Sequence, residues 1–163
     1  MNSLLIWNAK FNQMLHNALD GIGLLLVRVW VAQEFIRAGW GKLAAGMEAP
    51  QWFAMLHFPI PQAWFSANTN WFLAGIGEVA LGSLLLLGLG SRLAALGLLY
   101  VTWVAVYTVH FDLGWAGWNQ IETETGQGFK VPLMIAVMLI AICTQGGGRY
   151  ALDVCLPRHD SST

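Results

Sequence analysis

Four ionisable residues lie within the apolar stretches of this 163-residue chain, where charged side chains are rare. Arg28, Glu34 and Arg37 lie in the first such stretch, and Glu78 lies in the second. A charge in the hydrocarbon layer costs about 2.5–3.5 kcal/mol on insertion scales, so it normally faces a bundle interior with a partner. Buried carboxylates beside an arginine suit proton transfer or ligand binding, because desolvation and a neighbouring charge move their pKa values in opposite directions.

Helical spacing predicts that Glu34, Arg37 and Glu78 form one polar cluster inside the membrane. At a rise of about 1.5 Å per residue, Arg37 lies about 9 Å and Glu78 about 10 Å from the outer ends of their helices. This shared depth predicts that Arg37 pairs with Glu78, while Arg28 points to a different sector nearer the cytoplasm. Two interpretations stay open: an ion network that fixes helix register, and an outward-opening pocket that binds or protonates a ligand.

One face of a later apolar stretch is aromatic, because Tyr100, Trp103 and Tyr107 follow i, i+3, i+7 spacing. Residues with this spacing lie on the same side of a helix. The face is suited to stacking on a planar ring such as a quinone head group. Ordinary packing between helices is the alternative interpretation.

Metal-binding residue types are sparse and weakly organised in this sequence. His57, His110 and Asp112 are weak candidates, with Met47 and Met55 near them. Imidazole and thioether groups suit copper, but no regular spacing joins these residues into a ligand set. Structural or interfacial roles are the alternative interpretation. The sequence therefore predicts no defined metal site.

The composition indicates an all-α membrane protein with an antiparallel four-helix transmembrane bundle. Hydrophobic residues make up 56% of the chain and charged residues only 10%, against about 25% charged residues in soluble domains. A helix needs about 17–25 mostly apolar residues to cross a bilayer. Four stretches meet this requirement: residues 21–44, 71–90, 92–110 and 130–146. Short turns between such helices make neighbours antiparallel.

The flanking segments predict the orientation of the bundle. Basic residues lie mainly on the side of the two termini, whereas acidic residues gather in the two long, aromatic loops. The positive-inside rule then predicts a multi-pass membrane protein with both termini in the cytoplasm. Residues 1–20 have the spacing of an amphipathic helix on the membrane surface, or of one packed on the bundle. Residues 21–155 form the membrane domain, and residues 156–163 form a disordered cytoplasmic tail.

Composition and motifs also argue against several classes of function. The formal net charge is −1 and no basic patch with stacking aromatics is present, which argues against nucleic acid as a partner. Cys143 and Cys155 lack C-x-x-C spacing and fall near the cytoplasmic end, where thiols stay reduced. No dinucleotide fingerprint, haem-ligand pair or P-loop is present, so the chain carries no obvious electron carrier of its own.

Five short motifs occur in a characteristic order along the chain. They are LLVRV at residues 25–29, GWGKL at 39–43, EVALG at 78–82, GLGSR at 88–92 and GGGRYALD at 146–153. Together they resemble the DoxX family of small bacterial four-helix membrane proteins, over most of the membrane domain. The resemblance assigns no catalytic set, and only Arg28, Lys42, Glu78 and Arg92 carry over as family-motif positions.

The FKVP motif at residues 129–132 and the glycine-rich tail are most similar to the HvfX branch of that family. Members of this branch are associated with the maturation of copper-binding peptides. The resemblance therefore implies an integral protein of the bacterial plasma (inner) membrane, linked either to a membrane oxidoreductase or to copper-peptide maturation. A link to copper rests on this resemblance alone.

Three function hypotheses follow from these observations. In the first, the chain is an accessory subunit of a redox or copper-peptide pathway, and its polar pocket binds a quinone-like or small acidic ligand. In the second, it is a small transporter or export partner within the bilayer, acting as a homo-oligomer. In the third, it is a non-catalytic membrane anchor for a soluble oxidoreductase. The sequence names neither the substrate nor the partner protein.

Overall fold

Four long helices make up most of the part of the chain that the structure describes. The computed structural model describes residues 7–8, 10–14 and 19–155. The long helices are α2 (Ile22–Ala44), α4 (Ala67–Leu87), α5 (Ser91–Val109) and α6 (Lys130–Gln145). The shorter elements are α3 (Gln51–Ala54), the 3₁₀ helices η1 (Gln62–Trp64), η2 (Gly114–Asn119) and η3 (Leu152–Cys155), and the antiparallel strands β1 (Glu122–Thr123) and β2 (Gly126–Gln127).

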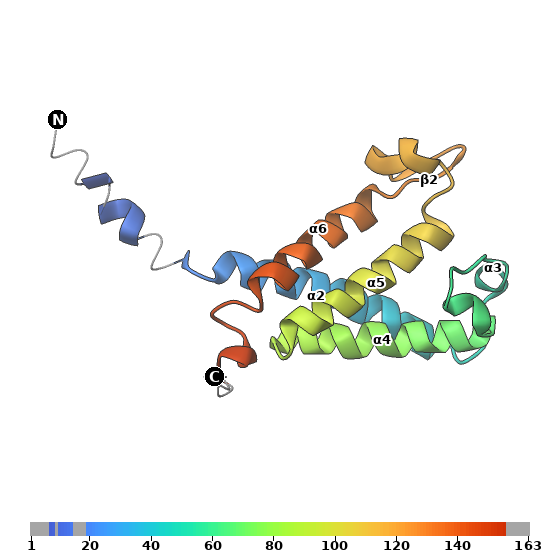
Figure 1. Ribbon diagram of the computed structural model, residues 1–163, viewed down its shortest axis with the longest axis horizontal. Coiled ribbons are helices and arrows are strands. Elements are labelled where there is room, and N and C mark those ends of the chain that lie inside the picture. Colours follow the sequence, from blue (N-terminus) through green and yellow to red (C-terminus); the bar gives the residue numbers. More distant parts are fainter. Residues whose placement is uncertain (1–6, 9, 15–18, 156–163) are drawn as a thin grey trace, which may run out of the picture.

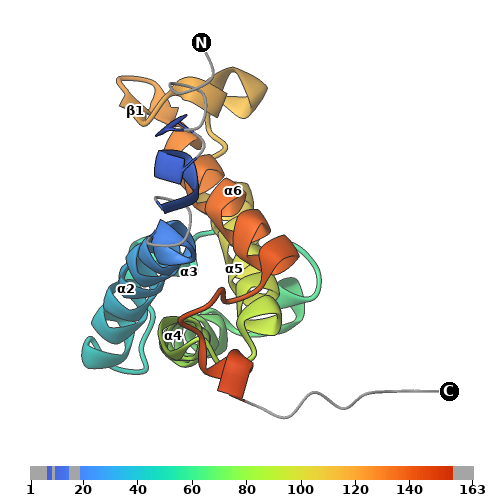
Figure 2. The same cartoon turned by 90° about the vertical axis from the view of Figure 1, so that its left-hand side faces the viewer.

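The long helices form two pairs that meet at one end of the molecule. Helix α2 packs along α4, and α5 packs along α6. The pairs join where α4 turns into α5 and where α6 ends, and they separate toward the other end (Figures 1 and 2). Segment 46–66 lies at the separated end, next to the start of α4 (Figure 1).

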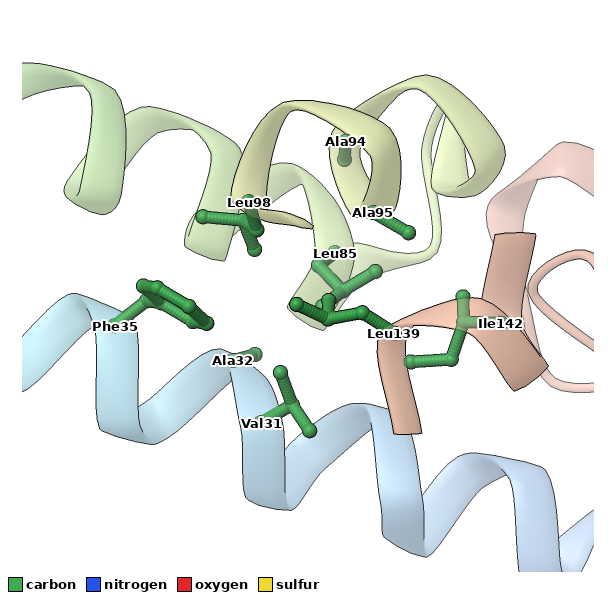
Figure 3. Packing of buried hydrophobic residues seen from close by; sticks show 9 residues of the cluster. All are labelled: Val31, Ala32, Phe35, Leu85, Ala94, Ala95, Leu98, Leu139 and Ile142. Atoms are coloured by element: carbon green, nitrogen blue, oxygen red, sulfur yellow. The ribbon is translucent and has the colours of Figure 1, made fainter. Parts of the chain in front are cut away.

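A small apolar core holds the pairs together at the joined end. Its nine buried side chains come from all four long helices (Figure 3): Val31, Ala32, Phe35, Leu85, Ala94, Ala95, Leu98, Leu139 and Ile142. Eight of the nine are almost completely inaccessible to solvent, and Phe35 is 9% exposed. Alanine at positions 32, 94 and 95 lets the helix backbones approach closely, as small residues do in membrane helices.

Local sequence signals explain where the helices begin and end. The Ser66 hydroxyl caps α4 by accepting a hydrogen bond from the Thr69 amide at 3.1 Å, which satisfies one free N–H of the first turn. Gly88 and Gly90 take left-handed backbone conformations, with φ of 73° and 59°. Glycine adopts this conformation without steric strain, so the chain can turn sharply from α4 into α5.

Glycines also set how closely α2 and α4 approach. A Cβ built on Gly39 would lie 2.7 Å from the carbonyl oxygen of Gly75 and 2.8 Å from the Cβ of Glu78. A Cβ on Gly82 would lie 2.9 Å from the Cγ1 of Ile36. These contacts place the middle of α2 beside the middle of α4, with the two helices running in opposite directions.

Length and composition allow two of the helices to cross a membrane. Helices α4 and α5 pass this test within the described residues, and α6 is a shorter apolar helix. Helix α2 is longer, but Arg28, Glu34, Arg37 and Lys42 interrupt its apolar sequence. All four stretches that were expected to be helical are helices, and their bounds differ from the predicted ones by at most four residues.

The two predicted flanking segments fall partly or wholly outside the described residues. Of residues 1–20, the structure describes helical positions between Trp7 and Met14, where the rings of Trp7 and Phe11 stack with centroids 5.4 Å apart. The side chains of Trp7 and Met14 are exposed. The predicted tail at residues 156–163 lies outside the described residues.

Candidate functional site: a cavity between the helix pairs

The charged residue that reaches Glu78 is Lys42 of α2. Its Nζ atom lies 2.7 Å from Glu78 Oε2, and the carboxylate side chain is only 8% exposed. Lys42 Nζ also lies 5.9 Å from the centroid of the Trp71 ring, within the range of a cation–π contact. The close approach of α2 and α4 at Gly39 brings the two charges together, so local backbone packing positions this ion pair.

The predicted pairing of Arg37 with Glu78 is therefore wrong. Arg37 is exposed on the opposite face of α2, and Glu34 is half-buried and accepts a hydrogen bond from Gln33 Nε2 at 3.1 Å. The pairing was expected because Arg37 and Glu78 lie at similar depth along their helices. Depth does not determine on which face of the helix a side chain lies. The inward face is marked by i, i+3, i+7, i+11, i+14 spacing, which includes these positions: Arg28, Val31, Phe35, Gly39 and Lys42.

A cavity of about 500 Å³ lies between the separated ends of α4 and α5, with the Lys42–Glu78 pair in its wall. Segment 46–66 contributes to the wall at the separated end of the helix pairs. Most of the lining is apolar or aromatic, including Trp52, Phe53, Phe58, Phe65, Tyr100 and Val104. This volume and this mostly apolar lining with a few polar groups are typical of small-molecule sites.

Two polar atoms of residues that line the cavity are buried without a hydrogen-bond partner in the described part of the chain. They are Gln62 Oε1 and His110 Nδ1. The other end of the Gln62 amide donates a hydrogen bond to the Tyr100 hydroxyl, so its orientation is held. A buried polar atom left unpaired is destabilising by about 1–3 kcal/mol. Both atoms have almost no accessible surface, so a polar molecule in the cavity relieves this penalty if the two side chains turn toward it.

The aromatic face predicted on α5 forms a continuous ladder. The ring centroids of Tyr100 and Trp103 are 5.8 Å apart, and those of Trp103 and Tyr107 are 6.0 Å apart. All three side chains are about half-exposed. Only Tyr100 lines the cavity, whereas Trp103 lines an apolar groove between α5 and α6. The structure thus offers one ring of this face, rather than all three, to a molecule in the cavity.

The three weak metal candidates lie in different settings. His57 is exposed, His110 lines the cavity, and the Asp112 carboxylate accepts a hydrogen bond from the Gln127 amide at 3.1 Å. Within residues 7–8, 10–14 and 19–155, no group of three or more His, Cys, Asp or Glu side chains could hold a metal ion. Of the three, His110 alone becomes part of the candidate site.

A second polar cluster lies at the joined end of the helix pairs, around Arg28. Its side chain is only 2% exposed. Nη1 donates to the Gly147 carbonyl at 2.6 Å and Nη2 donates to the Tyr150 carbonyl at 2.9 Å. The guanidinium therefore binds the chain that follows α6, and it does not snorkel to the membrane surface.

Asp153 anchors the same C-terminal segment to the turn between α4 and α5. Its carboxylate accepts hydrogen bonds from the Gly90 amide at 2.7 Å, the Ser91 amide at 3.0 Å and the Ser91 hydroxyl at 2.8 Å. Desolvation by itself would raise the pKa of Asp153. These hydrogen bonds and the charge of Arg28 outweigh it, so the pKa lies below its ordinary value. Hydrogen bonds to the charged form act in this direction.

The family-motif residues thus fall into two separate sites. Lys42 and Glu78 belong to the cavity, whereas Arg28 contacts the C-terminal segment. Arg92 also lies at the joined end, where its Nη1 donates to the Cys143 carbonyl at 3.3 Å. Sequence spacing singled out these positions, but only the structure shows which of them meet.

Fold and site together define a helical membrane protein with a mostly apolar, polar-tipped cavity between two helix pairs. The model of the DoxX family matches residues 23–111. An uncharacterized protein of Haemophilus influenzae is 33% identical over 141 residues, which cover 85% of this chain and 86% of the relative. The chain belongs to the DoxX family of membrane proteins. No solved structure matches it.

Proposed function

We propose that this protein binds a quinone-like molecule in the cavity between the helix pairs, as an accessory subunit of a membrane redox pathway. The observation that carries the proposal is a mostly apolar cavity of about 500 Å³ whose wall contains Gln62 and His110, two residues that each have a buried polar atom with no hydrogen-bond partner in the described part of the chain. A quinone or quinol head group presents oxygen atoms on opposite sides of a planar ring. Such a molecule needs a few polar partners among apolar walls.

The lining residues match the parts of such a ligand. Aromatic rings of Phe53, Phe58 and Tyr100 are suited to stacking on a planar head group. His110 is able to accept or donate a hydrogen bond, and Gln62 Oε1 accepts one. The Lys42–Glu78 pair supplies a proton donor and acceptor deeper in the wall.

The joined end of the molecule favours binding over passage of a substrate through the bundle. There the apolar core fills the space between all four long helices. The Arg28 hydrogen bonds to Gly147 and Tyr150 tie the C-terminal segment across the same end. The cavity lies toward the separated end, so its geometry supports a binding site rather than the transporter alternative.

The wider setting that we propose follows the family and the sequence. The four long helices form a transmembrane bundle of the bacterial inner membrane, with both termini in the cytoplasm and residues 1–20 on the membrane surface. The pathway partner is an oxidoreductase or, as in the HvfX branch, a system that matures copper-binding peptides. The second alternative, a pure anchor for a soluble oxidoreductase, leaves the cavity and its unpartnered atoms without a role.

Binding of a short-chain ubiquinol analogue, the reduced form whose hydroxyl groups donate hydrogen bonds, to the protein in lipid nanodiscs tests the proposal, with the change in tryptophan fluorescence as the measurement. Trp52 lines the cavity and reports on its occupancy. We expect Gln62→Leu and His110→Phe each to weaken binding of the quinol about five- to tenfold, because each removes one hydrogen-bond partner of a ligand hydroxyl group.

Matched controls come from the same outer region. Gln51→Leu and His57→Phe make the same chemical changes at exposed positions that do not line the cavity, and we expect unchanged binding. If the wild-type protein fails to bind the analogue, or if all four variants bind it equally while folded, the proposal is wrong.

A further inference from the structure

The outward face of α2 carries two charges that the described part of the chain does not pair. Arg37 is exposed and forms no ion pair or hydrogen bond within residues 7–8, 10–14 and 19–155. Glu34, one turn away, has only the Gln33 amide as a partner among the residues that the structure describes. Opposite charges at this spacing point the same way from the helix.

Packing against α4 shows how deep these charges lie. The contacts of Gly39 with Gly75 and of Gly82 with Ile36 place Arg37 level with Val79 of α4. At about 1.5 Å per residue, that position is about 12 Å from one end of α4 and about 18 Å from the other. An arginine at this depth, on the face turned away from its own bundle, is costly to leave without a partner in the membrane.

The surface around the charges has the shape of a contact between helices. Glu34, Arg37, Ala38 and Gly41 follow i, i+3, i+4, i+7 spacing along one face. A Cβ on Gly41 would meet no atom within 4 Å, in contrast to Gly39, which packs against α4. Small residues beside polar groups allow a second membrane helix to approach closely and to form hydrogen bonds.

We propose that this face of α2 binds the same face of a second copy of the chain. Two copies inserted in the same direction are related by a two-fold axis along the membrane normal, so their α2 helices run parallel. A contact of this kind is self-complementary. Arg37 of each copy then pairs with Glu34 of the other, because the two residues differ in depth by only about 4.5 Å. The charge of the face as a whole is balanced.

Disulfide cross-linking in native membranes tests the contact, in a parent protein with Cys143 and Cys155 changed to alanine. We expect Gly41→Cys to give a covalent dimer on mild oxidation. Val137→Cys, at an exposed position of α6, is the matched control, for which we expect no dimer. Equal cross-linking at both positions, or a link to a different protein with no dimer, would overturn the proposal.

Charge exchange provides a second measurement on the Gly41→Cys background. We expect Arg37→Glu to abolish the cross-link, because two acidic residues then face two others. The double variant Glu34→Arg, Arg37→Glu restores both pairs and is expected to restore the cross-link. Failure of the double variant to do so, while it accumulates as a folded membrane protein, contradicts the pairing. Arg37 and Glu34 do not line the cavity, so this result is independent of ligand binding.

Discussion

Gly39 shows how one absent side chain determines the position of an ion pair. Its hydrogen faces the Gly75 carbonyl and the Cβ of Glu78, which leaves no room for a methyl group. The same close approach brings Lys42, less than one turn further along α2, within 2.7 Å of Glu78. Helix packing and the charge pair in the cavity wall are therefore linked through a single residue.

The first prediction belongs to this residue. We expect Gly39→Ala to destabilise the protein by about 1–3 kcal/mol, because the added methyl group overpacks the contact between α2 and α4. Thermal unfolding in detergent is the measurement. Gly77→Ala on α4 is the control, since a Cβ there meets no atom within 4 Å, and its stability should not fall. An equal loss in both variants would show that the contact at Gly39 is looser than described.

The residues also show what spacing alone left undetermined. Arg37 and Lys42 lie five positions apart on α2, yet one is exposed and the other binds Glu78. Both are basic, and both lie in the C-terminal half of the helix. The stripe that runs from Arg28 through Phe35 to Lys42 identifies the inward face of α2. Once that face is known, it favours Lys42 over Arg37 as the partner of Glu78.

Among the elements, the short segment after α6, residues 146–155, ties the ends of several helices together. Arg28 holds its carbonyl oxygens from within α2, and Asp153 holds the turn between α4 and α5. The segment is thereby bound to three helices at once. Gly147 is required here, because a Cβ at this position would lie 2.4 Å from the Ser91 hydroxyl oxygen.

The pH dependence of this anchor is the second prediction. The folded-state pKa of Asp153 lies below its ordinary value, so the anchor stabilises the protein fully above the ordinary carboxyl pKa of about 3.9. That stabilisation is lost as the pH falls through the lower folded-state value. Proteolysis of the C-terminal segment in detergent, followed from pH 7 downward, measures it.

Asp153→Asn is the matched variant for this anchor. It removes the charge but keeps the size of the side chain, and we expect a loss of about 1–3 kcal/mol at neutral pH, because hydrogen bonds to a charged acceptor are strong. Its stability should also lose part of the acid dependence of the wild type. If both proteins respond to acid in the same way, groups other than Asp153 control the transition.

For the whole molecule, the arrangement of the two helix pairs determines where a ligand fits. The apolar core joins the pairs at one end, and the cavity opens between them at the other. Segment 46–66 is attached to α4 near that opening through the Trp71 indole, which donates to the Gly46 carbonyl at 3.2 Å. The loop is thereby held over the separated end.

The third prediction concerns the orientation of the molecule in the membrane. With both termini in the cytoplasm, Cys155, which is exposed, should react with a membrane-impermeant maleimide only after the cells are permeabilised. Glu122→Cys, in the exposed hairpin of the outer loop, should react in intact cells in a background that lacks the native cysteines. Labelling of Cys155 in intact cells would reverse the assigned orientation.

Much of the architecture could be read from the sequence because it depends on local patterns. Apolar runs of sufficient length, the glycines at residues 88 and 90 and the terminal glycine motif predict four helices and their limits. The family resemblance rests on the same local motifs, and the family model matches residues 23–111. The aromatic spacing of Tyr100, Trp103 and Tyr107 likewise predicts a shared helix face.

Tertiary structure alone determined which charged groups meet. Residues far apart in sequence, such as Lys42 and Glu78 or Arg28 and Gly147, come together because of how glycine contacts rotate and offset the helices. Depth along a helix follows from sequence position at a constant rise per residue. The direction in which a side chain points relative to its neighbours depends on helix packing, so the cavity with Gln62 and His110 in its wall became visible only in three dimensions.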